Sequence, residues 1–352
     1  MATHHRGAHA WSVLDVQGVT ADASPDQESR EGSGPAQPDN PRFSVCVATR
    51  NSGAGIIPTL LSMRDLDHDS FEVIVVDQST DKRTERAYRQ TVGDDQRFSY
   101  FASDTVGRTA ACNLATTRAV GVNLAFTDDD CLVPRDWLAG MERALDRHPE
   151  VGMVCGGIRG VPHDESRNYT VDFIPRRAQV HRSPWLAFRA VGIGGGNLVL
   201  RSQVLRDVGG FDEVLGVGAP LRAFEEVDLV YRLLRIGQRT LELPEPSVLH
   251  CELKPWDTAG RQLVANYAFG EGALMIKHLR MGELAALPLL VPPLVRVRWR
   301  NVVRLRRPNG LLSLAAFIRG ACAGFGFAID RRSRRYVPRH DSRPRAAASD
   351  HS

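Results

Sequence analysis

Short apolar runs alternate with helix-forming stretches through residues 43–158, and this alternation constrains the fold more than any other feature of the chain. The apolar runs, rich in Val, Ile and Phe, predict strands at 43–49, 71–77, 98–101, 122–127 and 151–158. The stretches between them predict helices at 56–64, 81–92, 109–119 and 134–147. Strands that alternate with helices favour an α/β fold with a mainly parallel, doubly wound, Rossmann-like sheet.

Polar residues follow three of these predicted strands at the point where each strand ends. They are Thr49-Arg50-Asn51, Asp77-Gln78-Ser79 and Asp128-Asp129-Asp130. In sheets of this kind, ligands bind outside the carboxyl ends of the strands, where the three groups would meet. The sequence therefore predicts a binding site at this edge of the sheet.

The three consecutive aspartates indicate a cation site. Their carboxylates repel one another unless a cation neutralises the charge, and alternate residues of an extended segment point the same way. Asp128 and Asp130 could therefore share one ion, and Mg²⁺ commonly takes one or two carboxylates together with substrate phosphates. A solvated acidic turn is the alternative. His250, which follows an apolar run at 247–249, is either a further metal ligand or an ordinary packed histidine.

Seven segments together carry a resemblance to a known family. They are Phe43–Asn51, Val75–Asp81, Gly107–Asn113, Phe126–Asp130, Gly194–Arg201, Val208–Asp212 and Glu225–Leu229, the last followed by Arg232. In this order, over residues 42–255, the set resembles the family 2 glycosyltransferases of the GT-A fold, which are inverting enzymes. The resemblance implies a nucleotide-sugar substrate, with residues 42–158 binding the donor and residues 159–260 forming the acceptor side.

The resemblance also implies roles for individual residues. Asp77 would accept a hydrogen bond from the nucleobase, and Thr49 and Asn51 would line the nucleoside pocket. Arg108 and Asn113 would lie near the ribose or diphosphate, and Asp129 belongs to the same set. Asp128 and Asp130 match the family's D-x-D motif, which holds Mg²⁺ or Mn²⁺ on the diphosphate.

The catalytic base is expected at the start of a helix predicted from residue 225 to 236. The family usually places Asp where this chain has Glu226, one methylene longer, so Asp228 is the reserve candidate. Acidic residues in a first helical turn are also favoured by the helix dipole alone. Residues 216–222 just before this helix are expected to form a mobile lid.

The donor-sugar and acceptor loop is expected at Gly195, Gly196 and Asn197, whose glycines would let the backbone approach both substrates. Trp185 could stack on a sugar ring, although a packing role is equally consistent with the sequence.

The two ends of the chain differ from its centre. Residues 1–41 lack apolar periodicity and an apolar core of signal-peptide length, which predicts a disordered tail. Six scattered cysteines without a C-x-x-C pair favour a reducing compartment. Fourteen arginines and two aspartates lie between Arg296 and Arg345, whereas the whole chain has a formal net charge of +4.

The basic C-terminal part predicts an anionic partner. Residues 261–330 should form an apolar and basic helical extension, and residues 331–352 a basic disordered tail. Arg319 lies near the middle of the apolar stretch 310–329, at a cost of about 2.5–3.5 kcal/mol for a membrane span. We therefore expect peripheral contact with anionic lipid on the cytoplasmic face of a membrane. Recognition motifs for nucleic acid are absent, so we expect no nucleic-acid partner.

These observations lead to one preferred function and two alternatives. The preferred function is a metal-dependent, inverting glycosyltransferase that uses a UDP- or dTDP-sugar and a glycan or lipid-linked acceptor, in surface glycan or glycolipid synthesis. A sugar-nucleotide pyrophosphorylase would need a Gly- and Arg-rich loop after the first strand, where residues 49–56 offer only Arg50, Gly53 and Gly55. A non-catalytic glycan- or lipid-binding module would be favoured only if Glu226 cannot act as a base.

Overall fold

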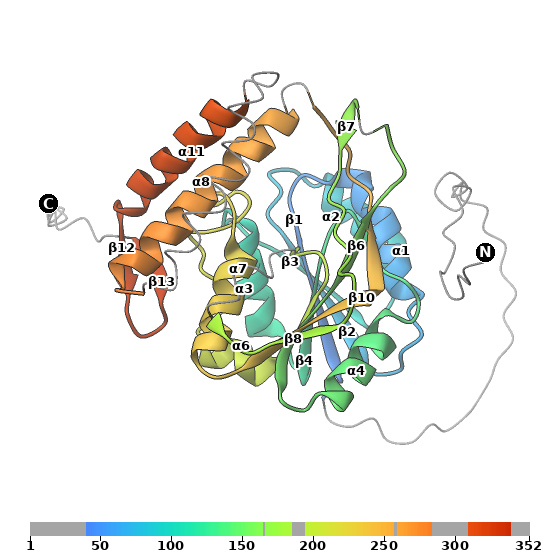
Figure 1. The fold of residues 1–352 in the computed structure, drawn as a ribbon. Coiled ribbons are helices and arrows are strands. Elements are labelled where there is room, and N and C mark those ends of the chain that lie inside the picture. The colour runs from blue at the N-terminus through green and yellow to red at the C-terminus, as the bar shows by residue number, and fades with distance from the viewer. Residues whose placement is uncertain (1–39, 165, 185–193, 257–258, 284–308, 339–352) are drawn as a thin grey trace, which may run out of the picture. The chain divides into compact units, whose positions relative to one another are not determined.

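The structure is a computed structural model that describes residues 40–164, 166–184, 194–256, 259–283 and 309–338. Within these residues, nine strands form one sheet in the order β3-β2-β1-β4-β9-β6-β10-β5, with β8 paired to β10 (Figure 1). The strands are β1 (Phe43–Thr49), β2 (Phe71–Asp77), β3 (Phe98–Ala102), β4 (Asn123–Asp128), β5 (Cys131–Leu132), β6 (Val151–Gly160), β8 (Gln179–His181), β9 (Leu198–Arg201) and β10 (Arg239–His250).

The sheet is mainly parallel, as the sequence predicts. β3, β2, β1, β4, β6 and β10 run in one direction, whereas β9, β5 and β8 run antiparallel to their neighbours. The register pairs Thr49 with Asp77 and Ala48 with Asp128, so β1, β2 and β4 end side by side. The three polar segments that follow them therefore begin at one edge of the sheet.

Helices cover both faces of the sheet. One hydrophobic core lies under α1 (Ile57–Arg64), α2 (Arg83–Val92) and α4 (Trp137–Arg147), and a short 3₁₀ helix (Gly53–Ile56) precedes α1. The other core lies under α3 (Arg108–Arg118), α6 (Ser202–Asp207) and α7 (Glu225–Arg235). Both cores consist mainly of aliphatic side chains from the strands, and they fix the helix ends that reach the sheet edge.

Two further helices belong to the second core and do not form a separate unit. α8 (Ala259–Arg280) packs along α11 (Asn309–Gly324), and the hairpin of β12 (Phe327–Asp330) and β13 (Arg335–Pro338) follows (Figure 1). A Cβ atom at Gly272 would overlap the Phe317 carbonyl oxygen, and one at Gly320 would overlap the Phe269 carbonyl oxygen. The two helix backbones are therefore in close contact. Tyr336 of β13 is buried with this core.

Three differences from the sequence predictions stand out. β10 extends from residue 239, well before the predicted run at 247–249, with a register shift between Leu243 and Val248 around its prolines. Residues 331–338, expected within a disordered tail, include the turn and second strand of the β12–β13 hairpin. A small sheet of β7 (Asn168–Tyr169) and β11 (Lys254–Pro255) lies in a stretch where no strand was predicted.

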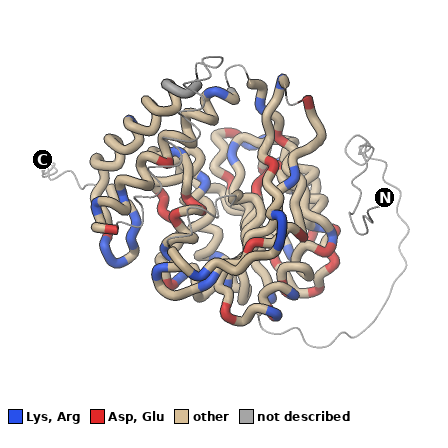
Figure 2. Tube along the Cα trace, in the orientation of Figure 1, with Lys and Arg blue, Asp and Glu red and all other residues tan. Residues whose placement is uncertain are grey.

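The charge distribution sets the C-terminal elements apart. Figure 2 shows α11 as almost uncharged and the turn between β12 and β13 as a basic stretch. Among the described residues, no helix combines the length and the hydropathy that a membrane span requires. The arginines from 296 to 307, on which the membrane prediction partly depends, lie outside the described residues, as do residues 1–39 of the tail predicted at 1–41.

Candidate active site

Backbone pairing brings the acidic segment after β4 beside the end of β10. β5 pairs antiparallel with β10, matching Cys131 with His250, and the Cys251 amide donates to the Asp130 carbonyl oxygen at 2.9 Å. As a result, the His250 Nε2 atom lies 3.4 Å from an Asp130 carboxylate oxygen. The Thr170 hydroxyl lies 3.0 Å from His250 Nδ1 and fixes the orientation of the ring.

The side chains gathered here form a donor set suited to a divalent cation. Ligand atoms of Asp130, His250 and Glu252 lie within 4.8 Å of one another, and one oxygen of Asp128 lies equally close to Asp130. Burial raises the pKa of Asp130 to about 7, with Asp128 and Glu252 adding to the shift, and burial lowers the pKa of His250. Crowded carboxylates beside a neutral imidazole fit a hard or borderline cation, which would relieve their mutual repulsion.

Glu252 is a functional candidate that the sequence interpretation missed. It stands two residues after His250, and alternate residues of an extended segment point the same way. This two-residue spacing is the sequence feature from which Glu252 could have been predicted. The Cys131 thiol is the other nearby group, but burial raises its pKa well above the usual range, which disfavours the thiolate that a metal needs.

Arg108 connects the acidic segment to the expected base. Its Nε atom donates to Asp128 at 2.6 Å, Nη1 lies 3.2 Å from Glu226, and Nη2 donates to the Gly195 carbonyl oxygen at 2.7 Å. Arg108 is the first residue of α3 because Gly107 precedes it with a φ of 108°, a conformation that favours glycine. The guanidinium thus joins three segments that are distant in the sequence.

Glu226 lies in the first turn of α7, with a side chain that is 13% exposed. Burial raises its pKa well above the usual value, the neighbouring Glu225 raises it further, and Arg108 opposes both effects. A carboxylate with a raised pKa at the edge of a polar site is suited to accept a proton. The structure therefore brings Glu226 to the place expected of a base.

Gly195 and Gly196 lie against the same groups. A Cβ atom at Gly195 would overlap the Glu226 carboxylate, and one at Gly196 would lie 3.1 Å from the Asp128 carboxylate. Only glycine lets the backbone come this close to both acids. The structure thus brings Arg108, Asp128, Gly195, Gly196 and Glu226 together.

The side chains predicted for the nucleoside end of the site also lie together. Thr49 donates to the Asp129 carboxylate at 2.5 Å, and burial raises the pKa of Asp129 to about 6. Asn51 has a φ of 58° and accepts from the Thr80 amide at 3.2 Å, which links the loops after β1 and β2. These bonds shape a polar edge between the ends of the two strands.

Asp77 is more enclosed than a base-contacting carboxylate should be. It is buried, and its oxygens accept hydrogen bonds from the Ser79 amide and the Tyr100 hydroxyl. In this structure it orders the loop after β2, and its contact with a nucleobase stays a prediction.

The geometry argues against two of the predicted contacts. Asn113 donates to the Phe211 carbonyl oxygen at 3.0 Å and accepts from the Phe211 amide at 2.8 Å, which holds that turn and leaves it away from the donor site. Asn197 is fully buried; it accepts from the Trp137 indole at 2.9 Å and donates to the Gly157 and Pro246 carbonyl oxygens. Both side-chain amides form hydrogen bonds within the protein. A sequence motif does not distinguish such residues from residues that contact a substrate.

Asp228 is not placed to act as the reserve base. Its side chain is 0% exposed and contacts Lys277 Nζ at 2.5 Å and Arg232 Nε at 2.7 Å. Burial raises the pKa of Asp228, but the charges of Lys277 and Arg232 outweigh this effect, so the pKa lies well below its ordinary value. A carboxylate held ionised and enclosed by cations is a poor proton acceptor.

Two remaining predictions have different outcomes. Trp185 lies outside the described residues. In the loop at 216–222, the Val217 carbonyl oxygen accepts from the Arg108 amide at 2.9 Å, and just before the loop the Leu215 carbonyl oxygen accepts from the Thr109 hydroxyl at 2.9 Å. The movement of this loop as a lid stays a prediction.

The sheet order, the acidic motif after β4 and the glutamate at the start of α7 define a GT-A glycosyltransferase fold. Residues 44–209 match the family model described as "Glycosyl transferase family 2". This segment, slightly less than half of the chain, is similar to that family.

Known proteins agree with this assignment. A pre-mycofactocin glycosyltransferase of Mycobacterium tuberculosis is 25% identical over 304 residues, or 84% of this chain. The chain spans 58% of the length of that relative. A mannosyltransferase from Pyrobaculum calidifontis, solved with GDP-Man and Mn²⁺, superposes with a TM-score of 0.56 at 20% identity, covering 81% of this chain and 87% of that one. S. aureus TarS in complex with UDP-GlcNAc gives a TM-score of 0.50 at 18% identity, with 80% and 81% covered. These two structures support the fold.

Proposed function

We propose that this chain is an inverting, metal-dependent glycosyltransferase that moves a sugar from a nucleoside-diphosphate sugar to an acceptor hydroxyl. The observation that carries the proposal is the Arg108 bridge, which joins Asp128 at 2.6 Å and Glu226 at 3.2 Å. A single guanidinium thus spans the carboxylate of the D-x-D motif and the expected base. We expect the donor diphosphate to bind on the Asp128 side of this guanidinium and the acceptor hydroxyl on the Glu226 side.

The reaction follows from these positions. Glu226 accepts the proton of the acceptor hydroxyl, the acceptor oxygen bonds to the anomeric carbon, and the bond from that carbon to the diphosphate oxygen breaks. Direct attack inverts the configuration at the anomeric carbon. Asp128, Asp130 and His250, with Glu252, would hold Mg²⁺ or Mn²⁺. The ion would supply charge neutralisation for the departing nucleoside diphosphate. Arg108 keeps the carboxylates of Asp128 and Glu226 apart and partly neutralised.

The biological setting remains part of the proposal. The donor is a UDP- or dTDP-sugar and the acceptor a glycan or lipid-linked molecule, used in surface glycan or glycolipid synthesis. The basic and apolar C-terminal part would hold the enzyme on anionic lipid at the cytoplasmic face of a membrane. Since the curated relative is named for pre-mycofactocin, that compound belongs in an acceptor panel, and GDP-sugars belong in a donor panel because one structural neighbour was solved with GDP-Man.

A donor panel tests the proposal directly. UDP-, dTDP- and GDP-sugars are added with Mn²⁺ or Mg²⁺, thermal stability is measured, and hydrolysis of each donor is followed in parallel. A donor at a hundred times its Kd should add about 2.7 kcal/mol to the free energy of unfolding. If no nucleotide sugar stabilises the protein or is hydrolysed with either ion, the proposed function is wrong.

A variant tests the metal ligands. Asp130→Ala should remove metal-dependent nucleotide binding and turnover while the protein stays folded. Asp207→Ala, which changes an exposed aspartate at the end of α6, is the matched control and should bind like the parent. Undiminished Mn²⁺-dependent nucleotide binding by folded Asp130→Ala would contradict the assignment.

A further inference from the structure

The first turn of α7, which carries Glu226, is covered by the N-terminal half of α8. Arg222 Nη1 donates to the Asn266 side-chain oxygen at 3.1 Å, and the Arg222 guanidinium lies 4.2 Å from the centre of the Phe269 ring. A Cβ atom at Gly270 would lie 2.8 Å from the Ala223 carbonyl oxygen, so the α8 backbone touches this turn directly. These contacts fix the position of residue 267 relative to the expected base.

Tyr267 projects from this part of α8 next to the catalytic carboxylates. Its ring makes an edge contact with Phe224, with centroids 6.4 Å apart, and its side chain remains 41% exposed. Burial raises the pKa of its phenol, and Tyr169, Glu226 and Glu225 raise it further. Phe224, which the Tyr267 ring contacts, stands two residues before Glu226, so this ring lies near the start of α7.

A second aromatic pair lies close to Tyr267. Tyr169 of β7 contacts Trp256 with ring centroids 5.2 Å apart, and Trp256 follows β11, the partner strand of β7. A Cβ atom at Gly260 would lie 2.9 Å from the Trp256 ring, so this indole packs on the first turn of α8. Gly260 and Tyr267 lie about two helical turns apart on α8, so Tyr267 and the Tyr169–Trp256 pair lie along the same face of this helix.

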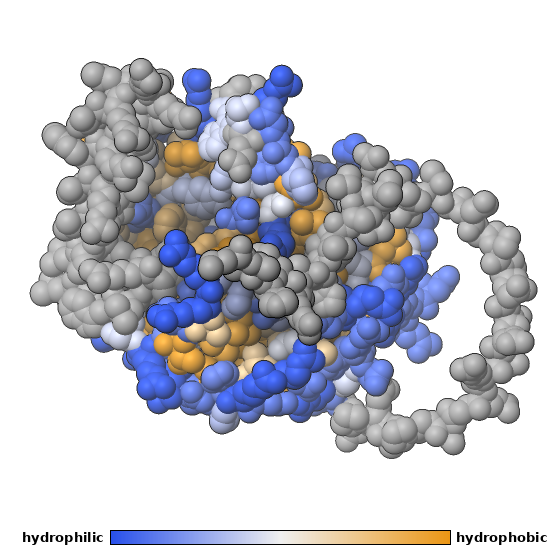
Figure 3. Space-filling view, turned by 45° about the vertical axis from the view of Figure 1, so that its right-hand side comes forward, coloured by the Kyte–Doolittle hydropathy of each residue, from blue (hydrophilic) through white to orange (hydrophobic). Residues whose placement is uncertain are grey.

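We propose that Tyr267, Tyr169 and Trp256 form an acceptor subsite that binds a pyranose ring beside Glu226. The proposal rests on the proposed function and names the acceptor class for the same site. Aromatic faces bury the C–H face of a sugar, and the tyrosine hydroxyls provide polar tips for its hydroxyl groups. A purely lipid tail would be better matched by aliphatic side chains. Figure 3 shows aliphatic and other strongly apolar residues (orange) exposed among hydrophilic ones (blue) on the face turned 45° from Figure 1, whereas Tyr and Trp fall toward the hydrophilic end of that colour scale.

The test compares transfer to a sugar with hydrolysis of the donor in the full chain. Methyl glycosides of glucose, galactose, mannose and N-acetylglucosamine serve as acceptor probes, with the donor that the panel identifies. At least one probe should be glycosylated, as detected by mass spectrometry. Tyr267→Ala should lower the ratio of transfer to hydrolysis at least tenfold by raising the KM for the probe. Tyr267→Phe, which keeps the ring, should stay within threefold of the parent.

Ile236→Ala is the matched control, because it shortens a comparably exposed apolar side chain at the far end of α7. It should leave both rates unchanged. The subsite is wrong if no methyl glycoside is glycosylated, if Tyr267→Ala leaves the probe KM unchanged, or if transfer and hydrolysis fall together. Retained Mn²⁺-dependent nucleotide binding shows that Tyr267→Ala has folded. Donor hydrolysis by the parent separates failure of this subsite from failure of the proposed function.

Discussion

At the residue scale, the Arg108 side chain makes three contacts from three separate nitrogen atoms, to Asp128, Glu226 and the Gly195 carbonyl oxygen. The planar guanidinium presents these donors in a fixed fork, which the point charge of a lysine cannot reproduce. The pKa of Glu226 is therefore coupled to the donor side of the site through one residue. Removing the charge of Arg108 should therefore change the pKa of Glu226.

The pH dependence of the reaction tests this coupling. Burial raises the pKa of Glu226 and Arg108 lowers it, and the base must be ionised to accept a proton. The rate should therefore rise with pH above the ordinary range of a glutamate. Arg108→Gln should shift this rise to higher pH, whereas Arg108→Lys, which keeps the charge, should shift it less. Identical pH–rate profiles for the parent and Arg108→Gln would contradict the coupling.

Removal of the base gives a second prediction at this scale. Glu226→Gln should lose transfer about 10²-fold or more, because the amide cannot accept the proton. Glu226→Asp should also be impaired, since a shift of about 1 Å in a catalytic group can cost about 10²-fold in rate. Nucleotide affinity, measured by thermal shift with Mn²⁺, should be retained in both variants. Near-parental transfer by Glu226→Gln would exclude Glu226 as the base.

Sequence motifs identified the residues of the site better than their roles. Asp128, Asp130 and His250 lie at or just after strand ends and Glu226 lies in the first turn of a helix, and at such positions the backbone directs side chains to the sheet edge. Asn113 and Asn197 are also motif residues, but their side chains donate to backbone carbonyl oxygens of the protein. The sequence does not show these partners. Asp228 differs from Glu226 through the presence of Lys277, which lies 49 residues away in the sequence.

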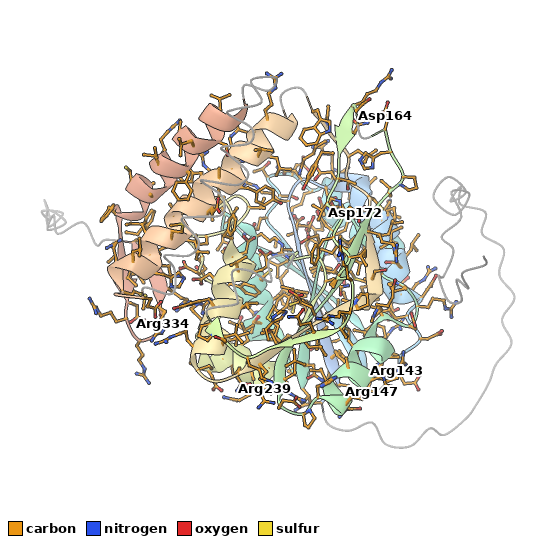
Figure 4. The ribbon with its side chains drawn as sticks, viewed as in Figure 1. Arg143, Arg147, Asp164, Asp172, Arg239 and Arg334 are labelled. Atoms are coloured by element: carbon orange, nitrogen blue, oxygen red, sulfur yellow. The ribbon has the colours of Figure 1, made fainter. Side chains whose placement is uncertain are left out.

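At the scale of elements, α7 is held by α8 through a buried ionic cluster. Lys277 is 0% exposed and contacts Asp212 at 2.7 Å and Asp228 at 2.5 Å, and the Tyr336 amide donates to Asp212 at 2.7 Å. Arg334, labelled in Figure 4 on the hairpin that follows α11, pairs with Glu283 just beyond α8. The helix that carries the base is thus fixed from the C-terminal elements.

Removing the central cation should destabilise the protein. Lys277→Met should lower the free energy of unfolding by about 3–5 kcal/mol, because the buried Asp212 loses its paired cation and the buried Asp228 loses one of its cationic partners. Lys82→Met, at an exposed ion pair before α2, should change it by less than about 0.5 kcal/mol. Urea unfolding measures both variants. A change at Lys277 as small as that at Lys82 would show that the cluster contributes little.

The same cluster predicts how stability changes in acid. The pKa of Asp228 is depressed in the folded state, so its contribution is present at neutral pH and is lost as the pH falls below about 4. The difference in unfolding free energy between the parent and Lys277→Met should therefore narrow in acid. If this difference in unfolding free energy stays the same down to pH 3, the ionised Asp228 is not the source of the stabilisation.

Local sequence pattern predicted the parallel strands of the sheet but not the antiparallel pairing in its second half. β1 to β4 and their helices follow from short-range periodicity, and their predicted bounds agree with the structure to within a few residues. The antiparallel pairing of β9 with β4 and β6, and of β5 with β10, joins segments far apart in the chain. Register between such segments depends on tertiary packing, which a single sequence does not display.

At the scale of the whole molecule, one face of α11 is apolar and exposed. Leu312, Ala315, Ile318, Cys322 and Phe325 recur at intervals of three or four residues, and Arg319 lies among them. Such a stripe beside basic side chains is typical of a helix that lies in the plane of an anionic membrane surface. This face is where we expect lipid contact.

Vesicle binding tests this expectation. Ile318→Glu should weaken binding to phosphatidylglycerol vesicles at least tenfold, because it places a charge in the apolar stripe. Val120→Glu, at a similarly exposed valine between α3 and β4, is the control and should bind like the parent. Neutralising Arg296, Arg298, Arg300 and Arg304 should lower binding and reduce its salt sensitivity. If the parent ignores these vesicles at low salt, the membrane proposal is wrong.

The ionic cluster also decides where the polypeptide can be divided. The family motifs end near residue 255, so a fragment that ends at residue 260 would contain all of them. That fragment would lack Lys277, so the buried Asp212 would lose its paired cation and Asp228 would keep Arg232 but lose its second cation. The smallest piece that folds by itself should instead reach the end of β13.

Two separately produced polypeptides, 40–283 and 309–338, should for the same reason recombine into one particle. The shorter one carries the Tyr336 amide that binds Asp212 and the helix backbone against which Gly272 packs. Recovery of turnover on mixing would then report core assembly by fragment complementation. α11 and the β12–β13 hairpin would thus bind as a separate polypeptide and complete the core of the enzyme.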